Sequence, residues 1–188
     1  MVEGRSLPVT RSNTGEEEAL QRIWRGVFVL GGILLLGGVG PQGAAAQGLP
    51  AEKYLPTGLA LELASASLEA CQKQGYRVSV AIVDRAGILR VLLRGDGAGP
   101  HSVDGARRKA YTSNTMRAGT AAVDERLRNT PASAGVRNID QLLPLAGGLP
   151  INVGNDTVAA IGVAGAPAGN LDEACAQAGL DKIKDRLN

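Results

Sequence analysis

The sequence predicts an α/β fold of the α+β kind, in which an antiparallel sheet is covered by helices on both faces. Two pairs of short apolar segments each flank a turn that contains glycine, as in a β-hairpin. Segments with helical spacing of apolar residues precede, separate and follow these pairs. The order helix, hairpin, helices, hairpin, helix favours antiparallel neighbours over the alternating strands and helices of a dinucleotide-binding fold.

The first helix is predicted over 57–73, where apolar residues recur at helical spacing. Strands are predicted over 77–84 and 88–94, joined by a short turn in which Gly87 can adopt a positive φ. Both faces of the first of these strands are largely apolar. We therefore expect both faces of the sheet to be covered.

The middle of the chain predicts further helices. One is expected over 103–118, with Ser102 as its N-terminal cap. A shorter helix is expected over 120–129, and a single helical turn over 138–143.

A second hairpin and a last helix follow. Strands are predicted over 149–153 and 157–163, on either side of a strong turn signal at 154–156. The residues Asn170-Leu-Asp-Glu173 resemble a capping box and predict the start of the last helix.

Residues 1–47 are predicted to be a secretory signal peptide and leader. Their apolar run, 27–39, is shorter than the ~20 residues of a membrane-spanning helix, and the small residues 44–46 after it suit a cleavage site. Cleavage is favoured over retention as an uncleaved membrane anchor. We therefore expect an exported protein, periplasmic or extracellular, with no membrane span in its mature part, a linker over 48–56 and one domain over 57–188.

Charge and aromatic content argue against a nucleic-acid partner. The chain has a net charge of +2, and removal of residues 1–47 leaves this value unchanged. Aromatic residues make up only 3% of the chain, whereas nucleic-acid binders combine a basic stripe with stacking aromatics.

The two cysteines leave two interpretations open. Cys71 and Cys175 both lie on apolar faces of predicted helices. They are either small buried core residues or the two halves of a disulfide, which an exported protein would allow. The sequence does not decide between these alternatives.

The single histidine lies where a glycine-rich loop runs into a basic helix start. His101 follows the loop 94–100, and Arg107, Arg108 and Lys109 come after it. A helix start exposes unpaired backbone N–H groups that favour anions, and glycines allow a ligand to approach the backbone. This stretch predicts a site for an anionic small molecule, with His101 as a possible ligand to its metal.

Other enzyme classes lack their signatures. Ser102 and Asp104 are sequence neighbours of His101, but no nucleophile elbow accompanies them. There is no phosphate-binding P-loop motif. One histidine and two distant cysteines cannot make a standard four-ligand zinc site.

Five phrases in the right order resemble the GlcG/HbpS family of haem-binding proteins. The phrases lie at 80–87, 94–100, 106–112, 147–151 and 160–165. The resemblance spans nearly all of residues 52–187. It implies a profilin-like fold, assembly into symmetric homo-oligomers, and haem or a related tetrapyrrole as ligand and cofactor, with haem degradation in some members.

Haem needs an apolar surface for its ring, cations for its propionates and, optionally, an axial ligand for iron. His101 is the best axial candidate, followed by Tyr111 and Met116, and Thr112 is expected to contribute an oxygen contact. The cations that could meet the propionates are Arg94, Arg107, Arg108 and Lys109.

The same residues also have ordinary interpretations. Asp104 and Arg108 could form a surface ion pair, and Lys109 could be solvated. His101 could simply follow Pro100 at a helix start.

The leading hypothesis is an exported haem-binding protein that scavenges, buffers or senses haem. One alternative is a cofactor-free haem-degrading enzyme, and another is an oligomeric interaction module that binds no ligand. The fate of the haem absorption band in the presence of a reductant separates the first two.

Overall fold

Four antiparallel strands form one sheet in the computed structural model, which describes residue 48 and residues 51–187. The first hairpin pairs β1 (Ser79–Asp84) with β2 (Leu89–Arg94), and the second pairs β3 (Gly148–Val153) with β4 (Asp156–Ala164). The strand order is β2-β1-β4-β3, so β1 and β4 form the centre of the sheet. Both predicted hairpins are confirmed.

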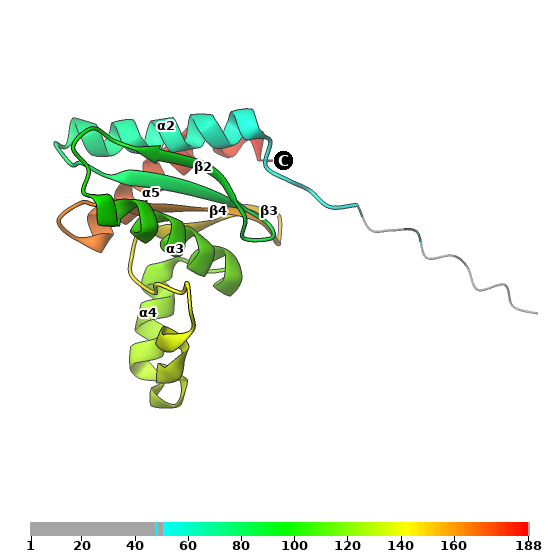
Figure 1. The fold of residues 1–188 in the computed structure, drawn as a ribbon. Helices are drawn as coiled ribbons and strands as arrows, with labels where there is room; N and C mark the ends of the chain where they lie inside the picture. The colour runs from blue at the N-terminus through cyan, green and yellow to red at the C-terminus, as the bar shows by residue number, and fades with distance from the viewer. Residues whose placement is uncertain (1–47, 49–50, 188) are drawn as a thin grey trace, which may run out of the picture. The chain divides into compact units, whose positions relative to one another are not determined.

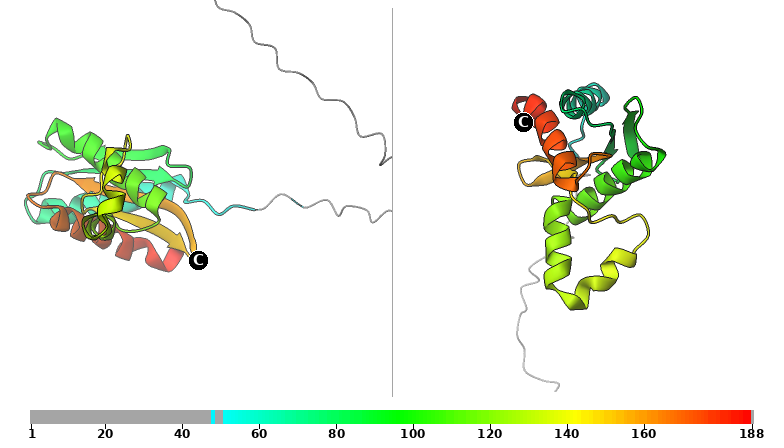
Figure 2. Two further views of the ribbon diagram at one scale, coloured as in Figure 1. Left: turned by 90° about the horizontal axis from the view of Figure 1, so that it is seen from below. Right: turned by 90° about the vertical axis from the view of Figure 1, so that its left-hand side faces the viewer.

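Helices cover both faces of this sheet, as the sequence predicts. α2 (Thr57–Lys73) and α5 (Gly169–Ile183) pack side by side on one face, and α3 (Pro100–Met116) lies on the other (Figure 1 and Figure 2). α4 (Thr120–Asn129) and the 3-10 helix η1 (Pro131–Asn138) follow α3 and extend away from the sheet (Figure 1). The short 3-10 helix η2 (Lys184–Arg186) continues from α5.

The core between the sheet and α2 and α5 consists of large aliphatic side chains. It includes residues that are 1% exposed or less, among them Leu63, Val80, Ile82, Ile161 and Ile183. A disulfide between Cys71 of α2 and Cys175 of α5 joins the two helices, with their Cα atoms 5.4 Å apart. Of the two interpretations of these cysteines, the structure therefore shows the disulfide.

The face covered by α3 is packed with small side chains. Its buried residues are Ala81, Val83, Ala106, Ala110, Ala160 and Ala164. A Cβ atom at Gly162 of β4 would lie 2.1 Å from the carbonyl oxygen of Ala106, so only glycine allows the helix to lie this close to the strand. This close approach brings the side chains of α3 down to the level of the sheet.

The predicted start of α3 was three residues late. Pro100 takes the first helical position, where its fixed φ and missing N–H are tolerated, and Gly99 precedes it. The hydroxyl of Ser102 donates a hydrogen bond to the carbonyl oxygen of Gly99 at 2.6 Å and does not cap the helix.

Two further local predictions were wrong. Residues 138–143 do not form a helical turn; η1 ends at Asn138, and Gln141 has a φ of 66°. The capping box at 170–173 does not form, because α5 begins at Gly169 and the carboxylate of Glu173 accepts a hydrogen bond from the backbone N–H of Gly147 instead.

The predicted signal peptide and leader, 1–47, lie outside the described residues, and so do residues 49–50 of the predicted linker. Within the part of the chain that the structure describes, no helix has the length and apolar character of a membrane span.

Candidate functional site

An open groove of about 610 Å³ lies between the N-terminal half of α3 and the start of α5. Four segments line it: the N-terminal half of α3, the loop 165–168 with the end of β4 before it, the first turn of α5 with Gly169 and Asp172, and residues 143 and 145 after η1. The groove therefore brings together parts of the chain that are far apart in the sequence.

α3 contributes a single stripe of side chains to the groove. The lining residues of this helix are His101, Asp104, Gly105, Arg108 and Lys109. Their spacing of three, one, three and one residues is that of one face of an α-helix. The helix start that the sequence singled out thus faces a real concavity.

His101 is the second residue of α3, and its side chain is exposed. Its imidazole folds back over the preceding loop, because a Cβ atom on Gly99 would lie 2.8 Å from its Nδ1 atom. No protein hydrogen bond to this ring is found among the described residues. Its nitrogens can therefore turn toward a ligand in the groove.

Lys109 is buried, with only 2% of its surface exposed. Its Nζ atom donates hydrogen bonds to Oδ2 of Asp172, at 2.7 Å, and to the carbonyl oxygen of Val163, at 3.0 Å. Gly147, with a φ of 119°, leaves space for this ammonium group, since a Cβ atom there would lie 3.0 Å from Nζ. The interpretation of Lys109 as a solvated surface residue was wrong, because the helical phase places it next to Ala106 and Ala110 on the sheet side.

Asp172 joins this ion pair to the wall of the groove. Its Oδ1 atom accepts a hydrogen bond from the backbone N–H of Ala166 at 2.9 Å, which fixes the loop 165–168. Burial raises the pKa of Asp172 above its ordinary value, and the hydrogen bond and charge of Lys109 offset part of this increase. The pair therefore fixes the position of the loop and leaves little net charge at the bottom of the groove.

Arg107 and Arg108 both reach across to the segment after η1. Arg108 donates a hydrogen bond from Nη2 to the carbonyl oxygen of Leu142 at 2.8 Å, and its Nε atom is buried without a hydrogen-bond partner. Arg107 donates hydrogen bonds to Oε1 of Gln141 and Oδ1 of Asp104, each at 2.9 Å. The predicted ion pair of Asp104 and Arg108 is present at 3.8 Å.

Thr112 is fully buried. Its hydroxyl group donates a hydrogen bond to the carbonyl oxygen of Arg108 and accepts one from the backbone N–H of Leu143, both at 2.7 Å. We call residues 141–145 the strap, because this segment crosses the side of α3 and carries two of the groove's apolar residues, Leu143 and Leu145.

The remaining predicted residues lie away from the groove lining. Arg94 donates hydrogen bonds to the carbonyl oxygen of Ala98. Tyr111 lies on another face of α3, against Gly87 in the turn between β1 and β2. Met116, at the end of α3, is contacted through its sulfur atom by Arg126 of α4 at 3.9 Å. The groove lining thus includes His101 and none of these three residues.

Sequence reasoning missed Asp172 and the two leucines of the strap. Asp172 was assigned to a capping box, and nothing in its local sequence indicates a buried partner 63 residues away. A signal for Lys109 was present, since its position in the helical repeat falls between buried alanines.

The arrangement suits a ligand with a broad apolar body and negatively charged groups. Leu143, Leu145 and the alanines and proline of 164–168 provide apolar surface, and Arg108 provides a cation. Among the described residues, no group of three or more His, Cys, Asp or Glu side chains is placed to hold a metal ion. His101 offers one nitrogen to a metal that a ligand would bring with it.

Comparison with known proteins identifies a family and several solved structures that are similar to this chain. The family model described as haem degrading protein HbpS-like matches residues 55–181. The chain is 45% identical to a protein whose crystal structure is described as that of HbpS, with a TM-score of 0.69, and the match covers 74% of this chain and 98% of that one. Comparison with curated protein sequences found no match.

Two further solved structures share the fold. A double glutamate-to-aspartate variant of HbpS from Streptomyces reticuli is 43% identical, with a TM-score of 0.69 and coverage of 78% of this chain and 98% of that one. A structure described as a PduOC:heme complex is 22% identical, with a TM-score of 0.64 and coverage of 69% and 94%, and it supports the fold alone.

Proposed function

We propose, from the fact that this chain belongs to the HbpS-like family of haem-degrading proteins, that it binds haem in the groove beside α3. The observation that carries this proposal is the joint presence of His101, Arg108 and an apolar wall around one cavity. Its volume of about 610 Å³ falls within the range of roughly 300–1,000 Å³ that is usual for small-molecule sites.

The residues of the groove match the chemistry of haem. Leu143 and Leu145 would contact the ring, and the guanidinium group of Arg108, which lines the groove, would meet a propionate. His101 would hold the haem iron through an imidazole nitrogen. Bound haem would supply a redox-active iron. The part of the protein is to hold the ring, orient it and exclude water from one side.

The other residues that were predicted to contact haem are engaged in contacts within the protein. Lys109 lines the groove, but its charge is paired with Asp172, so Arg108 is the cation available to a ligand. Arg94, Arg107, Tyr111 and Thr112 stay predictions as direct contacts, and each would have to change its present partner or orientation to reach the groove.

We also propose that the protein is exported and assembles with copies of itself, to scavenge, buffer or sense haem. The apolar run and small residues of 1–47 support export. The disulfide between Cys71 and Cys175 supports it independently, because such bonds persist mainly in oxidising compartments. The family resemblance is the basis for a homo-oligomer.

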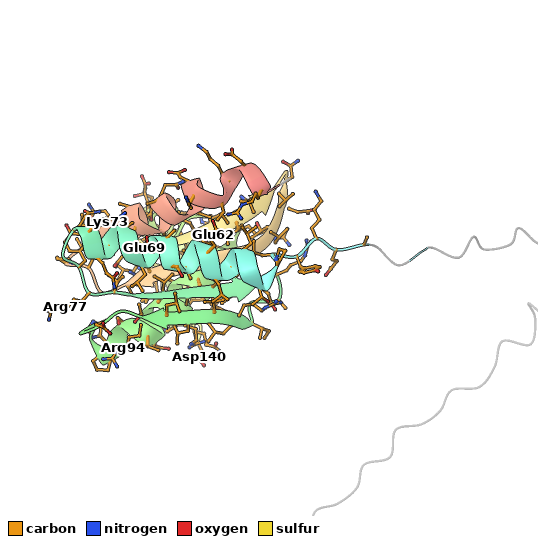
Figure 3. All side chains as sticks on the ribbon, turned by 90° about the horizontal axis from the view of Figure 1, so that it is seen from above. Glu62, Glu69, Lys73, Arg77, Arg94 and Asp140 are labelled. Carbon is orange, nitrogen blue, oxygen red and sulfur yellow. A yellow bond between two sulfur atoms is a disulfide. The ribbon has the colours of Figure 1, made fainter. Side chains whose placement is uncertain are left out.

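The test is a titration of the purified protein with haemin, followed by absorbance. Wild type should saturate, His101→Ala should shift the spectrum of the bound haem, and Arg108→Gln should weaken binding. Lys73→Gln removes one exposed positive charge at the end of α2, on the other face of the sheet, and should behave as wild type (Figure 3). Binding that does not saturate beyond a nonspecific protein control would refute the proposal.

Haem degradation is the second candidate, because the family model carries that description. Loss of the haem band with iron release, in the presence of a reductant and with catalase added to remove peroxide, would favour an enzyme. A stable spectrum under the same conditions would favour a binding protein.

A further inference from the structure

Three neighbouring side chains of α3 hold three consecutive residues of the strap. Arg107 donates to the side-chain oxygen of Gln141 at 2.9 Å, and Arg108 donates to the carbonyl oxygen of Leu142 at 2.8 Å. The hydroxyl of Thr112 accepts a hydrogen bond from the backbone N–H of Leu143 at 2.7 Å. Each residue of this part of the strap therefore has its own hydrogen bond to the helix.

The backbone of the strap is held in a conformation that needs such support. Gln141 has a φ of 66°, in the left-handed region that is unfavourable for a non-glycine residue. The side chain of Leu142 is only 3% exposed and anchors the segment against the protein. With this anchor, Leu143 and Leu145 are directed to the groove, and 49% of Leu145 remains exposed there.

The hydroxyl of Thr112 is fully used within the protein. It has one proton, which goes to the carbonyl oxygen of Arg108, and it accepts the N–H of Leu143. The side chain is also inaccessible to solvent, and Thr112 and Arg107 are both absent from the groove lining. A ligand could contact Thr112 only after the strap had moved away.

We propose that Thr112 and Arg107 are positioning residues, which determine ligand affinity by fixing the strap and the apolar wall that it carries. The inference rests on the proposed function, because it concerns the same groove. It predicts that these residues act on the ring of a tetrapyrrole and not on its iron. The metal-free ring protoporphyrin IX should therefore respond to their substitution as haemin does.

The main experiment compares Thr112→Val with wild type. Valine has nearly the same shape but cannot accept the hydrogen bond from Leu143, so affinity for haemin and for protoporphyrin IX should fall by the same factor, about threefold to tenfold. The absorption maximum of bound haem should not move. In the ligand-free protein, the backbone amide of Leu143 should exchange with solvent faster than in wild type.

Three further variants complete the design. Thr112→Ser keeps the hydroxyl and should restore both affinities and the slow amide exchange. Thr115→Val makes the same replacement at an exposed position one turn later and should change neither. Leu145→Ala, at a partly exposed site where folding is not at risk, should weaken both ligands equally and leave the exchange of Leu143 unchanged.

The results separate this proposal from its competitors. A loss of affinity for haemin alone, or a shifted haem band, would mean that Thr112 contacts the iron and would overturn the positioning role. Unchanged affinity in Thr112→Val, or an unchanged Leu143 amide, would also overturn it while haem binding stood. Failure of wild type to bind either ring would overturn the proposed function, and the role of the strap in binding with it.

Discussion

The two faces of the sheet are packed with different kinds of side chain. Toward α2 and α5, the sheet presents leucine, isoleucine and valine side chains, and a disulfide closes the layer. Toward α3, it presents mostly alanines, and the helix is held by a buried ion pair and by hydrogen bonds to the strap. Because a buried large aliphatic side chain contributes about 1.5–3 kcal/mol and an alanine much less, the first face is the main source of stability.

This difference shows how one small domain can combine a rigid core with a binding groove. Small residues let α3 approach the sheet closely, and the polar side chains on its other faces are then free to organise the groove. The comparison predicts that changes on the face of α2 and α5 alter stability without altering binding. The ion pair of Lys109 and Asp172 is the exception, because it should affect both.

The largest effect is expected for Lys109→Met, which tests whether the α3 face also contributes to stability. It would leave the carboxylate of Asp172, only 3% exposed, without its cation, at a cost of about 3–5 kcal/mol in the free energy of unfolding. Denaturant unfolding measures this loss. Lys109→Met combined with Asp172→Leu removes both charges and should recover most of it; equal stability of the single and double variants would contradict the explanation.

Removal of the disulfide should have the next largest effect on stability. It should lower stability without changing the binding groove beside α3. The bridge closes a separation of 104 residues, and Cys71→Ala with Cys175→Ala should lower the free energy of unfolding by about 2–4 kcal/mol. Haemin affinity of the folded variant should match that of wild type, when measured well below its melting temperature. A large loss of affinity there would show that the two faces are coupled.

A smaller effect of opposite sign is expected at Ser67 of α2. Its hydroxyl is buried without a hydrogen-bond partner, next to Gly179 of α5. Ser67→Ala should therefore stabilise the protein by about 1 kcal/mol in thermal or denaturant unfolding. Ser65→Ala, at an exposed position of the same helix, is the matched control and should change stability little.

The smallest effect is a dependence on pH from the α3 face. Burial raises the pKa of Asp172 in the folded state above its ordinary 3.8. A raised carboxyl pKa means that the folded state holds the proton more tightly, so the contribution of this group is present below pH 3.8 and is lost as pH rises through the folded value. NMR titration of the Asp172 carboxyl carbon should give a midpoint above 3.8, and a midpoint below it would contradict this prediction.

The hairpins and most helices could be predicted because their signals are local. The helix over 120–129 begins and ends where predicted, and the strands differ from prediction by one or two residues at their ends. The start of α3 was missed because Ser102 is a good cap in isolation, but Pro100 is pre-organised for the first helical turn.

The site was only partly predictable because its contacts are long-range. His101 and Arg108 were identified from their place at a helix start, and both line the groove. The leucines of the strap and Asp172 reach the groove only when the whole domain folds. They are too far from α3 in the sequence for a local pattern to indicate the contact. Gln141 shows the limit most clearly, since its backbone is left-handed and its side chain is bound by Arg107, a residue 34 positions earlier.

The position of the disulfide also sets an order for the maturation of the chain. Cys71 lies in α2 and Cys175 near the end of the described domain, so the sulfur atoms can meet only after the strands, α3 and the strap have all become available. Oxidation therefore cannot precede the synthesis of most of the described domain. Until oxidation occurs, α2 and α5 can dissociate and re-pair without a covalent penalty, and an incorrectly docked last helix can still be rearranged.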